Sequence, residues 1–223
     1  MIPILYQDDD CVAVMKPCGV AAVAERADDE TCLRSLLACQ LGRRVFPVHR
    51  LDKEVSGVIL FALSAAAHRA LNAAFERREV HKTYLAVVHG AVADDSGIIR
   101  SPIRAFGSGR MGVDAAKGKP SETRYEVVER RAAYSLVRLH PLTGRRHQLR
   151  VHLYSVGHPI AGDPLYGEPG LRLAGGHPRL MLTSTGLALR LPGGAALSLC
   201  GLVPADFRDA CQAVYGFCGG ERQ

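Results

Sequence analysis

A carboxylate flanked by cations stands at the entrance to an apolar run. In the stretch HRLDKEVSG, residues 49–57, Asp52 lies between Arg50 and Lys53, and the run GVILFALS overlaps its end. If this stretch is extended, the side chains of Arg50 and Asp52 point to one side and Leu51 faces the core. Two interpretations are open: a surface ion pair worth under about 1 kcal/mol, or a nucleophile that neighbouring guanidinium groups keep ionised.

A second polar cluster lies at the start of the segment RRHQLRVHLYSVG, residues 145–157, which is predicted to be a helix that ends in glycine. Its histidines, His147 and His152, are five residues apart, whereas two imidazoles that share a metal in HExxH are four apart. We therefore expect no metal site. Helix N-termini favour anions, so the start of the segment is predicted to face phosphate. The residues of this start are Arg145, Arg146, His147 and Gln148.

The segment HKTYLAVVHG has the alternation of a strand, with Lys82 and Tyr84 on one face and Thr83 and Leu85 on the other. A tyrosine in this place is either a residue at the edge of the core, with its hydroxyl in water, or a ring on which an extruded RNA base can stack. The sequence pattern alone leaves both open.

The segment GHPIAGDPLYG, residues 157–167, must form a rigid turn because it holds three glycines and two prolines. Its Asp163 competes with Asp52 as a candidate nucleophile. An aspartate directly before a proline in a tight turn more often accepts hydrogen bonds from its own backbone. We expect a structural role for Asp163.

The remaining apolar runs predict an α+β fold with a mostly antiparallel or mixed sheet, because strands dominate and helices occur irregularly among them. Two segments rich in glycine and basic residues, 105–120 and 167–179, are expected to be loops. The predicted helices are 31–42, 64–79, 145–157 and 204–216. The predicted strands are 4–6, 11–17, 57–64, 82–90, 123–130, 134–142, 180–191 and 196–204.

Length and composition predict one domain over residues 1–223. No signal peptide and no run of eighteen apolar residues is present, so a soluble, cytoplasmic protein without a membrane partner is expected. The seven cysteines form no CxxC pair and are expected to be reduced, mostly as core residues. The net charge of +6 and the clustered arginines fit a polyanionic partner.

Taken together, three of these segments and the N-terminal one resemble the successive motifs of the RluA-type pseudouridine synthases. The segments are ILYQDDDCVAVMKPCGV, HRLDKEVSGVILFAL, KTYLAVVHG and GRRHQLRVHLYSVGHPIAGDPLYG. The resemblance covers almost the whole chain in the same order. It implies the pseudouridine synthase fold, an α+β, mostly antiparallel mixed sheet flanked by helices with a central RNA-binding cleft.

The resemblance also implies roles for single residues. The family's catalytic aspartate falls on Asp52, its base-stacking tyrosine on Tyr84, and the arginine that pairs with the aspartate on Arg150. Arg50 matches the arginine that enters the space left by the flipped nucleotide. Lys82 and the start of the 145–157 segment are expected to contact RNA.

Such enzymes detach uracil from C1′ of the ribose and rejoin it through C5, without cofactor or metal. The uridine must first be flipped out, at a cost of a few kcal/mol. The aspartate, unprotonated, would attack either C1′ or C6. The implied substrate is structured ribosomal or transfer RNA, and we expect a monomer.

Three departures from the family pattern affect these expectations. Val55 stands where many relatives carry threonine, and Arg146 where a smaller threonine or serine is common. No S4 RNA-binding module is expected before the first strand pair. Substrate choice is therefore predicted to depend on the 105–120 and 167–179 loops.

Two other functions stay open at this point. The first is an RNA-binding or ribosome-assembly factor on the same scaffold that is catalytically silent. The second is a glycosidase-like hydrolase, which generally needs two carboxylates. The second carboxylate could only be Glu54, and Glu54 would share a face with Asp52 only if the strand stayed regular.

Overall fold

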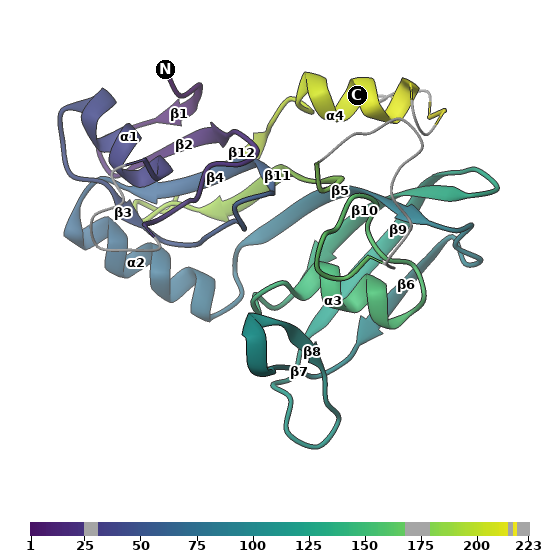
Figure 1. The fold of residues 1–223 in the computed structure, drawn as a ribbon. Coiled ribbons are helices and arrows are strands. Elements are labelled where there is room, and N and C mark those ends of the chain that lie inside the picture. The colour runs from purple at the N-terminus through teal and green to yellow at the C-terminus, as the bar shows by residue number, and fades with distance from the viewer. Residues whose placement is uncertain (25–30, 168–178, 214–215, 218–223) are drawn as a thin grey trace. The chain divides into compact units, whose positions relative to one another are not determined.

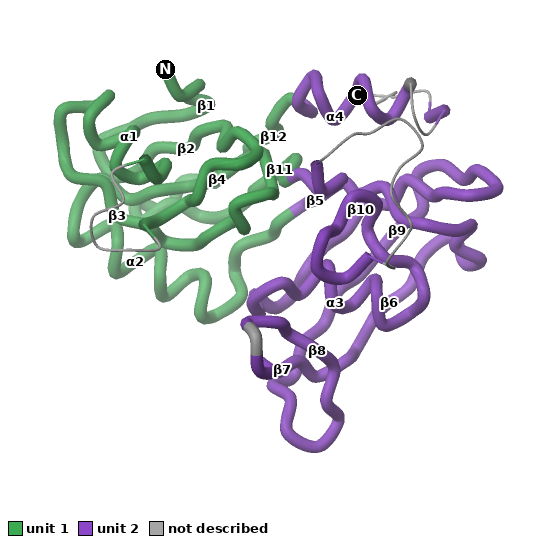
Figure 2. The backbone as a smooth tube through the Cα atoms, viewed as in Figure 1, with its two compact units in different colours: residues 1–82, 184–202 green, residues 83–183, 203–223 purple. Residues whose placement is uncertain are grey.

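The computed structural model describes four stretches of the chain, 1–24, 31–167, 179–213 and 216–217 (Figure 1). The chain forms two compact units (Figure 2). Unit 1 holds residues 1–82 and 184–202, and unit 2 holds residues 83–183 and 203–223. The single domain expected from the sequence stays a prediction.

Unit 1 consists of antiparallel strand pairs and two helices. Strand β2 pairs with β1 on one side and with β4 on the other, the short β3 pairs with β4, and β11 pairs with β12. In the strand order β11 follows β4. The elements are β1 (Ile4–Gln7), β2 (Cys11–Lys16), α1 (Leu33–Leu41), β3 (Phe46–Pro47), β4 (Ser56–Ala62), α2 (Ala65–Glu76), β11 (Leu182–Arg190) and β12 (Ala196–Cys200).

The core of unit 1 forms where α2 packs on β2 and β4. All seven residues of β4 are buried. Ala67 and Leu71 of α2 cluster with Val58 and Leu60 of β4. A strand that is buried on both faces has no polar face, which explains why GVILFALS is continuously apolar rather than alternating.

The ends of both helices of unit 1 follow from local residue types. The hydroxyl of Ser64, the first residue of the predicted helix 64–79, accepts a hydrogen bond of 3.0 Å from the backbone N–H of Ala67 and caps α2. Gly42, the last residue of the predicted helix 31–42, adopts φ 62° and ends α1 in the left-handed conformation. Gly57 is required in β4 because a Cβ atom there would lie 2.0 Å from the carbonyl oxygen of Ser184.

Unit 2 is built on four antiparallel strands in the order β5-β10-β9-β6. A separate pair, β7 with β8, forms a small hairpin. The elements are β5 (His81–His89), β6 (Ser96–Arg100), β7 (Ile103–Ala105), the 3-10 turn η1 (Gly107–Gly109), β8 (Met111–Val113), β9 (Glu122–Arg130), β10 (Tyr134–Pro141), α3 (Gln148–Ser155) and α4 (Ala205–Ala213). The predicted α+β fold class, with a mostly antiparallel sheet, is confirmed.

The prediction of a loop over 105–120 is wrong in part, because this segment contains the end of β7 and all of β8, which pair as a hairpin. Asp114 organises the turn that follows: one carboxylate oxygen accepts hydrogen bonds of 2.9 Å from the N–H groups of Ala116 and Lys117, and the other binds Arg104 at 2.5 Å. The strands are only three residues long, too short for a clear alternation. Residues 168–178 of the second expected loop lie outside the described part of the chain.

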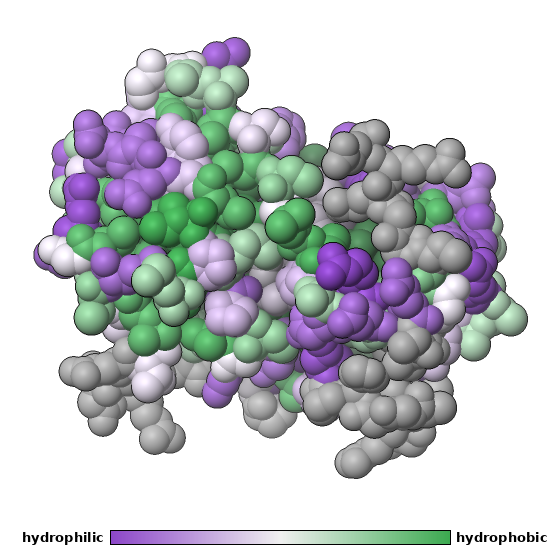
Figure 3. Space-filling view, turned by 90° about the horizontal axis from the view of Figure 1, so that it is seen from above, coloured by the Kyte–Doolittle hydropathy of each residue, from purple (hydrophilic) through white to green (hydrophobic). Residues whose placement is uncertain are grey.

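The surface of unit 1 is not uniformly polar. Seen from above, hydrophobic side chains gather over the left-hand part of the molecule, which belongs to this unit (Figure 3).

Among the described residues, no helix has both the length and the apolar character that crossing a membrane requires. Six cysteines of the described chain are free thiols, of which Cys11, Cys32 and Cys211 are buried, whereas Cys218 lies outside that part.

Candidate active site

Asp52 is the first residue of a tight turn. The carbonyl oxygen of Asp52 accepts a hydrogen bond of 3.1 Å from the N–H of Val55, and β4 begins at the next residue, Ser56. Leu51 is buried, Asp52 is half-buried and Arg50 is exposed, as the sequence pattern predicted for a carboxylate at a strand entrance. The turn thus fixes the position of the Asp52 backbone relative to the start of β4.

The segment that follows β2 holds this turn from the other side. The buried ammonium group of Lys16 donates to the carbonyl oxygens of Pro17 at 2.9 Å, Val20 at 2.6 Å and Lys53 at 3.0 Å. The N–H of Gly19 also donates to the Lys53 carbonyl, at 2.9 Å. One ammonium group therefore ties the two segments together directly beside Asp52.

A cysteine adds a contact between the same two segments. The thiol of Cys18 donates to the carbonyl oxygen of Glu54 at 3.1 Å. Neither Lys16 nor Cys18 was predicted from the sequence to take part in the site. The available signal was a lysine at the end of the apolar strand CVAVMK, where the alternation places it on the same face as Val12 and Val14.

Glu54 does not continue a regular strand from Asp52. Residues 53 and 54 form the turn, so the alternation that would place both carboxylates on one face is interrupted. A two-carboxylate hydrolase would need Glu54 and Asp52 on the same face of a regular strand, and this arrangement is missing.

Lys82 and Tyr84 lie two residues apart on β5, so their side chains share a face of that strand. Tyr84 is 8% exposed and pairs in register with Leu139 of β10. Burial lowers the pKa of Lys82 from 10.5 to about 8. Perturbed pKa values occur more often at functional sites than elsewhere, which makes Lys82 a candidate site residue.

His49, the first residue of the HRLD motif, is a structural residue. Its Nε2 accepts a hydrogen bond of 3.0 Å from the N–H of Leu60, and its ring stacks on Phe75 at 4.8 Å between centroids. Burial, and then the positive charge of Lys82, hold the pKa of His49 well below its ordinary value. The neutral ring can therefore keep its acceptor role toward β4.

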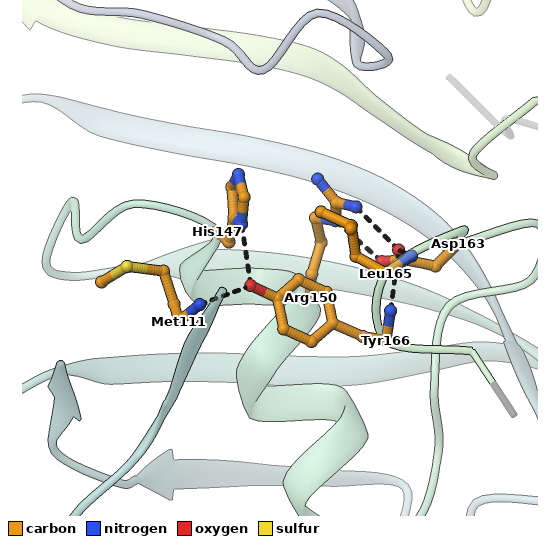
Figure 4. A network of polar contacts seen from close by, with 6 residues as sticks. All are labelled: Met111, His147, Arg150, Asp163, Leu165 and Tyr166. Atoms are coloured by element: carbon orange, nitrogen blue, oxygen red, sulfur yellow. Dashed lines mark hydrogen bonds and ion pairs between the residues drawn. The ribbon is translucent and has the colours of Figure 1, made fainter. Parts of the chain in front are cut away.

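Arg150 forms a buried, two-point ion pair with Asp163 (Figure 4). Its Nε and Nη2 each donate to a different carboxylate oxygen at 2.7 Å, and both side chains are almost completely buried. Asp163 also accepts hydrogen bonds from the N–H groups of Leu165, at 2.9 Å, and Tyr166, at 3.1 Å. The predicted structural role of Asp163 is confirmed, and its partner is the arginine that we expected to pair with Asp52.

Tyr166 connects this ion pair to the β7–β8 hairpin. The guanidinium carbon of Arg150 lies 5.1 Å from the centroid of the Tyr166 ring. The Tyr166 hydroxyl accepts a hydrogen bond of 2.9 Å from the N–H of Met111 and lies 2.8 Å from Nδ1 of His147 (Figure 4). Burial raises the pKa of Tyr166 above its usual value, so its hydroxyl stays protonated at neutral pH.

The comparisons with known proteins agree on one family. A family model described as RNA pseudouridylate synthase matches residues 10–155. The dual-specificity RNA pseudouridine synthase RluA of Escherichia coli strain K12 is 39% identical over 212 residues, covering 92% of this chain and 93% of the relative. The chain belongs to the RNA pseudouridylate synthase family.

Solved structures place the fold of this pseudouridine synthase in the same group. Human RNA pseudouridylate synthase domain containing 1 superposes with a TM-score of 0.81 at 29% identity, covering 96% of this chain and 87% of its own. Human RNA pseudouridylate synthase domain containing 4 gives 0.79 at 26% identity, covering 96% and 93%. The α+β architecture is thus the one that the sequence motifs implied.

The start of α3 differs from the expected phosphate-facing helix end. The helix begins only at Gln148, after His147 adopts φ 54°. Gln148 is 4% exposed, and its amide oxygen accepts from the hydroxyl of Thr143 at 2.6 Å and from the N–H of Arg145 at 3.0 Å. Its Nε2 donates to the carbonyl of Glu122 at 3.0 Å. Gln148 thus orients the loop before α3 of this pseudouridine synthase, and its expected RNA contact stays a prediction.

The other predicted RNA-contacting residues of this loop keep surface positions. Arg146 is exposed, and Arg145 and His147 are half-buried. Among the described residues no cluster of three metal-binding side chains is found. His152 is completely buried, with its Nδ1 2.9 Å from the Thr123 hydroxyl, which gives that histidine a role in the core.

Proposed function

We propose that this protein isomerises specific uridines of structured ribosomal or transfer RNA to pseudouridine, with Asp52 as the nucleophile. In this reaction the bond from N1 of the base to C1′ breaks and a bond from C5 to C1′ forms. The C5 proton leaves and N1 gains one, so that no cofactor or metal is required. The target uridine is flipped out of its stack to reach the carboxylate.

The fixed turn at Asp52 is the observation that carries this proposal. A nucleophile must stand in one place relative to the reacting carbon, since a displacement of about 1 Å can cost a hundredfold in rate. The three carbonyl contacts of Lys16 and the contact of Cys18 with Glu54 restrict the backbone on both sides of the turn. A surface carboxylate in a solvated ion pair needs no such support.

Further residues have proposed roles in the same reaction. Tyr84 holds the flipped base and assists loss of the C5 proton, and Arg150 is the catalytic partner of Asp52. Arg50 enters the space that the flipped nucleotide leaves. The exposed and half-buried cations Lys82, Arg145 and Arg146, together with His147, contact the RNA backbone, and the enzyme works as a monomer.

A pair of carboxylate variants tests the nucleophile. Asp52→Asn keeps the size of the side chain and removes its charge, so we expect pseudouridine formation in purified cellular RNA to fall at least about a thousandfold. RNA affinity should change by less than about threefold. Glu54→Gln is the matched control and should retain activity.

The two readouts, pseudouridine and free uracil, separate this proposal from its alternatives. Loss of activity in both variants, with free uracil released by the unmodified protein, would indicate a hydrolase with two carboxylates. RNA binding without any pseudouridine, from the unmodified protein as well as from Asp52→Asn, would indicate a silent RNA-binding protein.

A further inference from the structure

A pocket of about 350 Å³ lies in unit 2 between the β7–β8 hairpin and the C-terminal half of α3. Its size falls within the range of small-ligand sites. It is separate from the ion pair of Arg150 and Asp163 but shares one wall with it, the ring of Tyr166. The lining includes Phe106, Arg110, Met111, Val151, Tyr154 and Tyr166.

Two aromatic side chains in this lining are open to solvent. Phe106 is 42% exposed and Tyr154 is 47% exposed, which is unusual for large rings that belong to a cavity wall. The Phe106 ring lies against Gly112, where a Cβ atom would stand 2.8 Å from Cε2 of that ring. The glycine thus leaves room for the Phe106 ring against the hairpin.

Cations accompany these rings. The guanidinium carbon of Arg104 lies 4.1 Å from the Phe106 centroid, and that of Arg110 lies 5.4 Å from the Tyr166 centroid. Residues 101–120 carry four cationic side chains against one carboxylate, Asp114, which is already paired with Arg104. The segment therefore combines apolar ring faces with a net charge of +3.

An unstacked stretch of nucleic acid is complementary to this combination, because its bases offer flat faces and its phosphates offer negative charge. Single-stranded RNA is bound in this way, with bases stacked on aromatic rings or guanidinium planes. A neutral peptide or an uncharged lipid would satisfy the apolar faces but would offer the cations no negative charge.

We propose that this pocket is a second base-binding subsite, which takes one unstacked nucleobase from the RNA strand that carries the target uridine. The proposal rests on the proposed function for the identity of the strand. A base in the pocket contacts Tyr166, whose hydroxyl binds the N–H of Met111 and lies beside His147. Binding there stabilises the hairpin and the Tyr166 ring that packs beside Arg150.

Truncation of one wall measures the stacking contribution. Tyr154→Ala should weaken the binding of a single-stranded uridine nonamer by about tenfold, the loss expected for one stacked base. Val156→Ala is the matched control, since Val156 is 46% exposed and is not part of the pocket lining. A ribose-phosphate nonamer without bases should bind the Tyr154→Ala variant and the unmodified protein equally.

A fluorescent reporter gives a second, independent readout, because the chain contains no tryptophan. In the Phe106→Trp variant, the uridine nonamer should quench the single tryptophan saturably, and the nonamer without bases should not. In Val156→Trp neither RNA should quench the fluorescence. Quenching by both nonamers in Phe106→Trp, or by neither, would overturn the subsite.

Two further outcomes have defined meanings. A fluorescence change in Phe106→Trp that depends on protein concentration and needs no RNA would assign the pocket to a second copy of the chain and overturn the proposal. If the base-dependent quenching occurs but the unmodified protein forms no pseudouridine, the subsite stands and the proposed function fails. Pseudouridine formation without that quenching removes the subsite alone.

Discussion

At Arg150 the protein removes a guanidinium from water almost completely and pairs it with the buried carboxylate of Asp163. Burying two charges costs several kcal/mol for each ion, and the pair repays this only when the geometry satisfies both partners. Here two hydrogen bonds of 2.7 Å join the pair, and two backbone N–H groups donate further hydrogen bonds to the Asp163 carboxylate. Breaking this ion pair is therefore expected to lower the stability of the fold strongly.

The first prediction concerns this ion pair. Asp163→Asn should lower the free energy of unfolding by about 3–5 kcal/mol, because it removes the negative charge that accepts two hydrogen bonds from the buried guanidinium. Urea unfolding followed by circular dichroism measures the change. Asp95→Asn removes the exposed partner of Arg130 and should cost at most about 1 kcal/mol. Equal losses in the two variants would contradict the assigned role of Asp163.

The second prediction concerns the charge of Lys82. Burial lowers its pKa to about 8, so the side chain is cationic below that pH and becomes neutral as the pH rises through it. If the ammonium binds phosphate, RNA affinity should be constant up to about pH 7, one unit below this pKa. It should then fall by at least about tenfold toward pH 9.5, because a hydrogen bond from a charged group contributes about 1.5–3 kcal/mol.

Fluorescence anisotropy with a labelled RNA at constant ionic strength measures this pH profile. Lys82→Arg is the control, because arginine keeps its charge across the range and should give a flat profile. A decline of the same size in both proteins would place the titrating group elsewhere.

At the scale of elements, the segment 16–20 acts as a support for the turn 52–55. Two segments more than thirty residues apart in sequence meet through one buried ammonium group, one backbone N–H and one thiol. Lys16 thus connects the end of β2 to the entrance of β4, two strands that already pair in register along their length. The support positions Asp52 without touching substrate.

The third prediction tests this positioning role. Lys16→Met keeps an unbranched side chain, one atom shorter, but removes the ammonium donor from three carbonyl oxygens, which should cost about 1–3 kcal/mol in stability. Pseudouridine formation should fall about a hundredfold in kcat, because the turn loses its fixed position. RNA affinity and KM should stay within about threefold. A loss confined to KM would mean that Lys16 binds RNA instead.

The elements themselves were largely predictable, because they depend on local signals. Ser64 and Gly42 mark helix ends, and the long runs of β4, β5 and β11 exceed any turn in length. The short strands β3, β6, β7 and β8 were missed. A strand of two to five residues shows little alternation, and the hairpin depends on the side chain of Asp114, whose partners are known only once the chain has folded.

The candidate site was predictable to a smaller extent. Asp52, Tyr84 and Arg150 were named from their resemblance to family motifs, and the residue pattern alone had left the roles of Asp52 and Tyr84 open. The burial of Gln148 was not predicted because helix-start chemistry suggests a solvated end, whereas tertiary contacts with Thr143 and Glu122 bury it. Lys16 was overlooked because a lysine at a strand end is usually solvated.

For the molecule as a whole, family membership and the arginine-rich surface point to RNA as the substrate. The net charge of +6 gives a long-range attraction to polyanions that is independent of sequence and weakens with salt. Selection among uridines must then come from local contacts, such as those of the pocket beside the β7–β8 hairpin. General affinity and target choice are therefore separable properties of this enzyme.

Mapping pseudouridines in cellular RNA tests the central claim most directly. A strain that lacks this gene should lose pseudouridine at one or a few uridines of ribosomal or transfer RNA. The unmodified gene should restore them, and the Asp52→Asn gene, expressed at the same level, should not. Restoration by Asp52→Asn, or an unchanged pseudouridine map in the strain without the gene, would contradict the account.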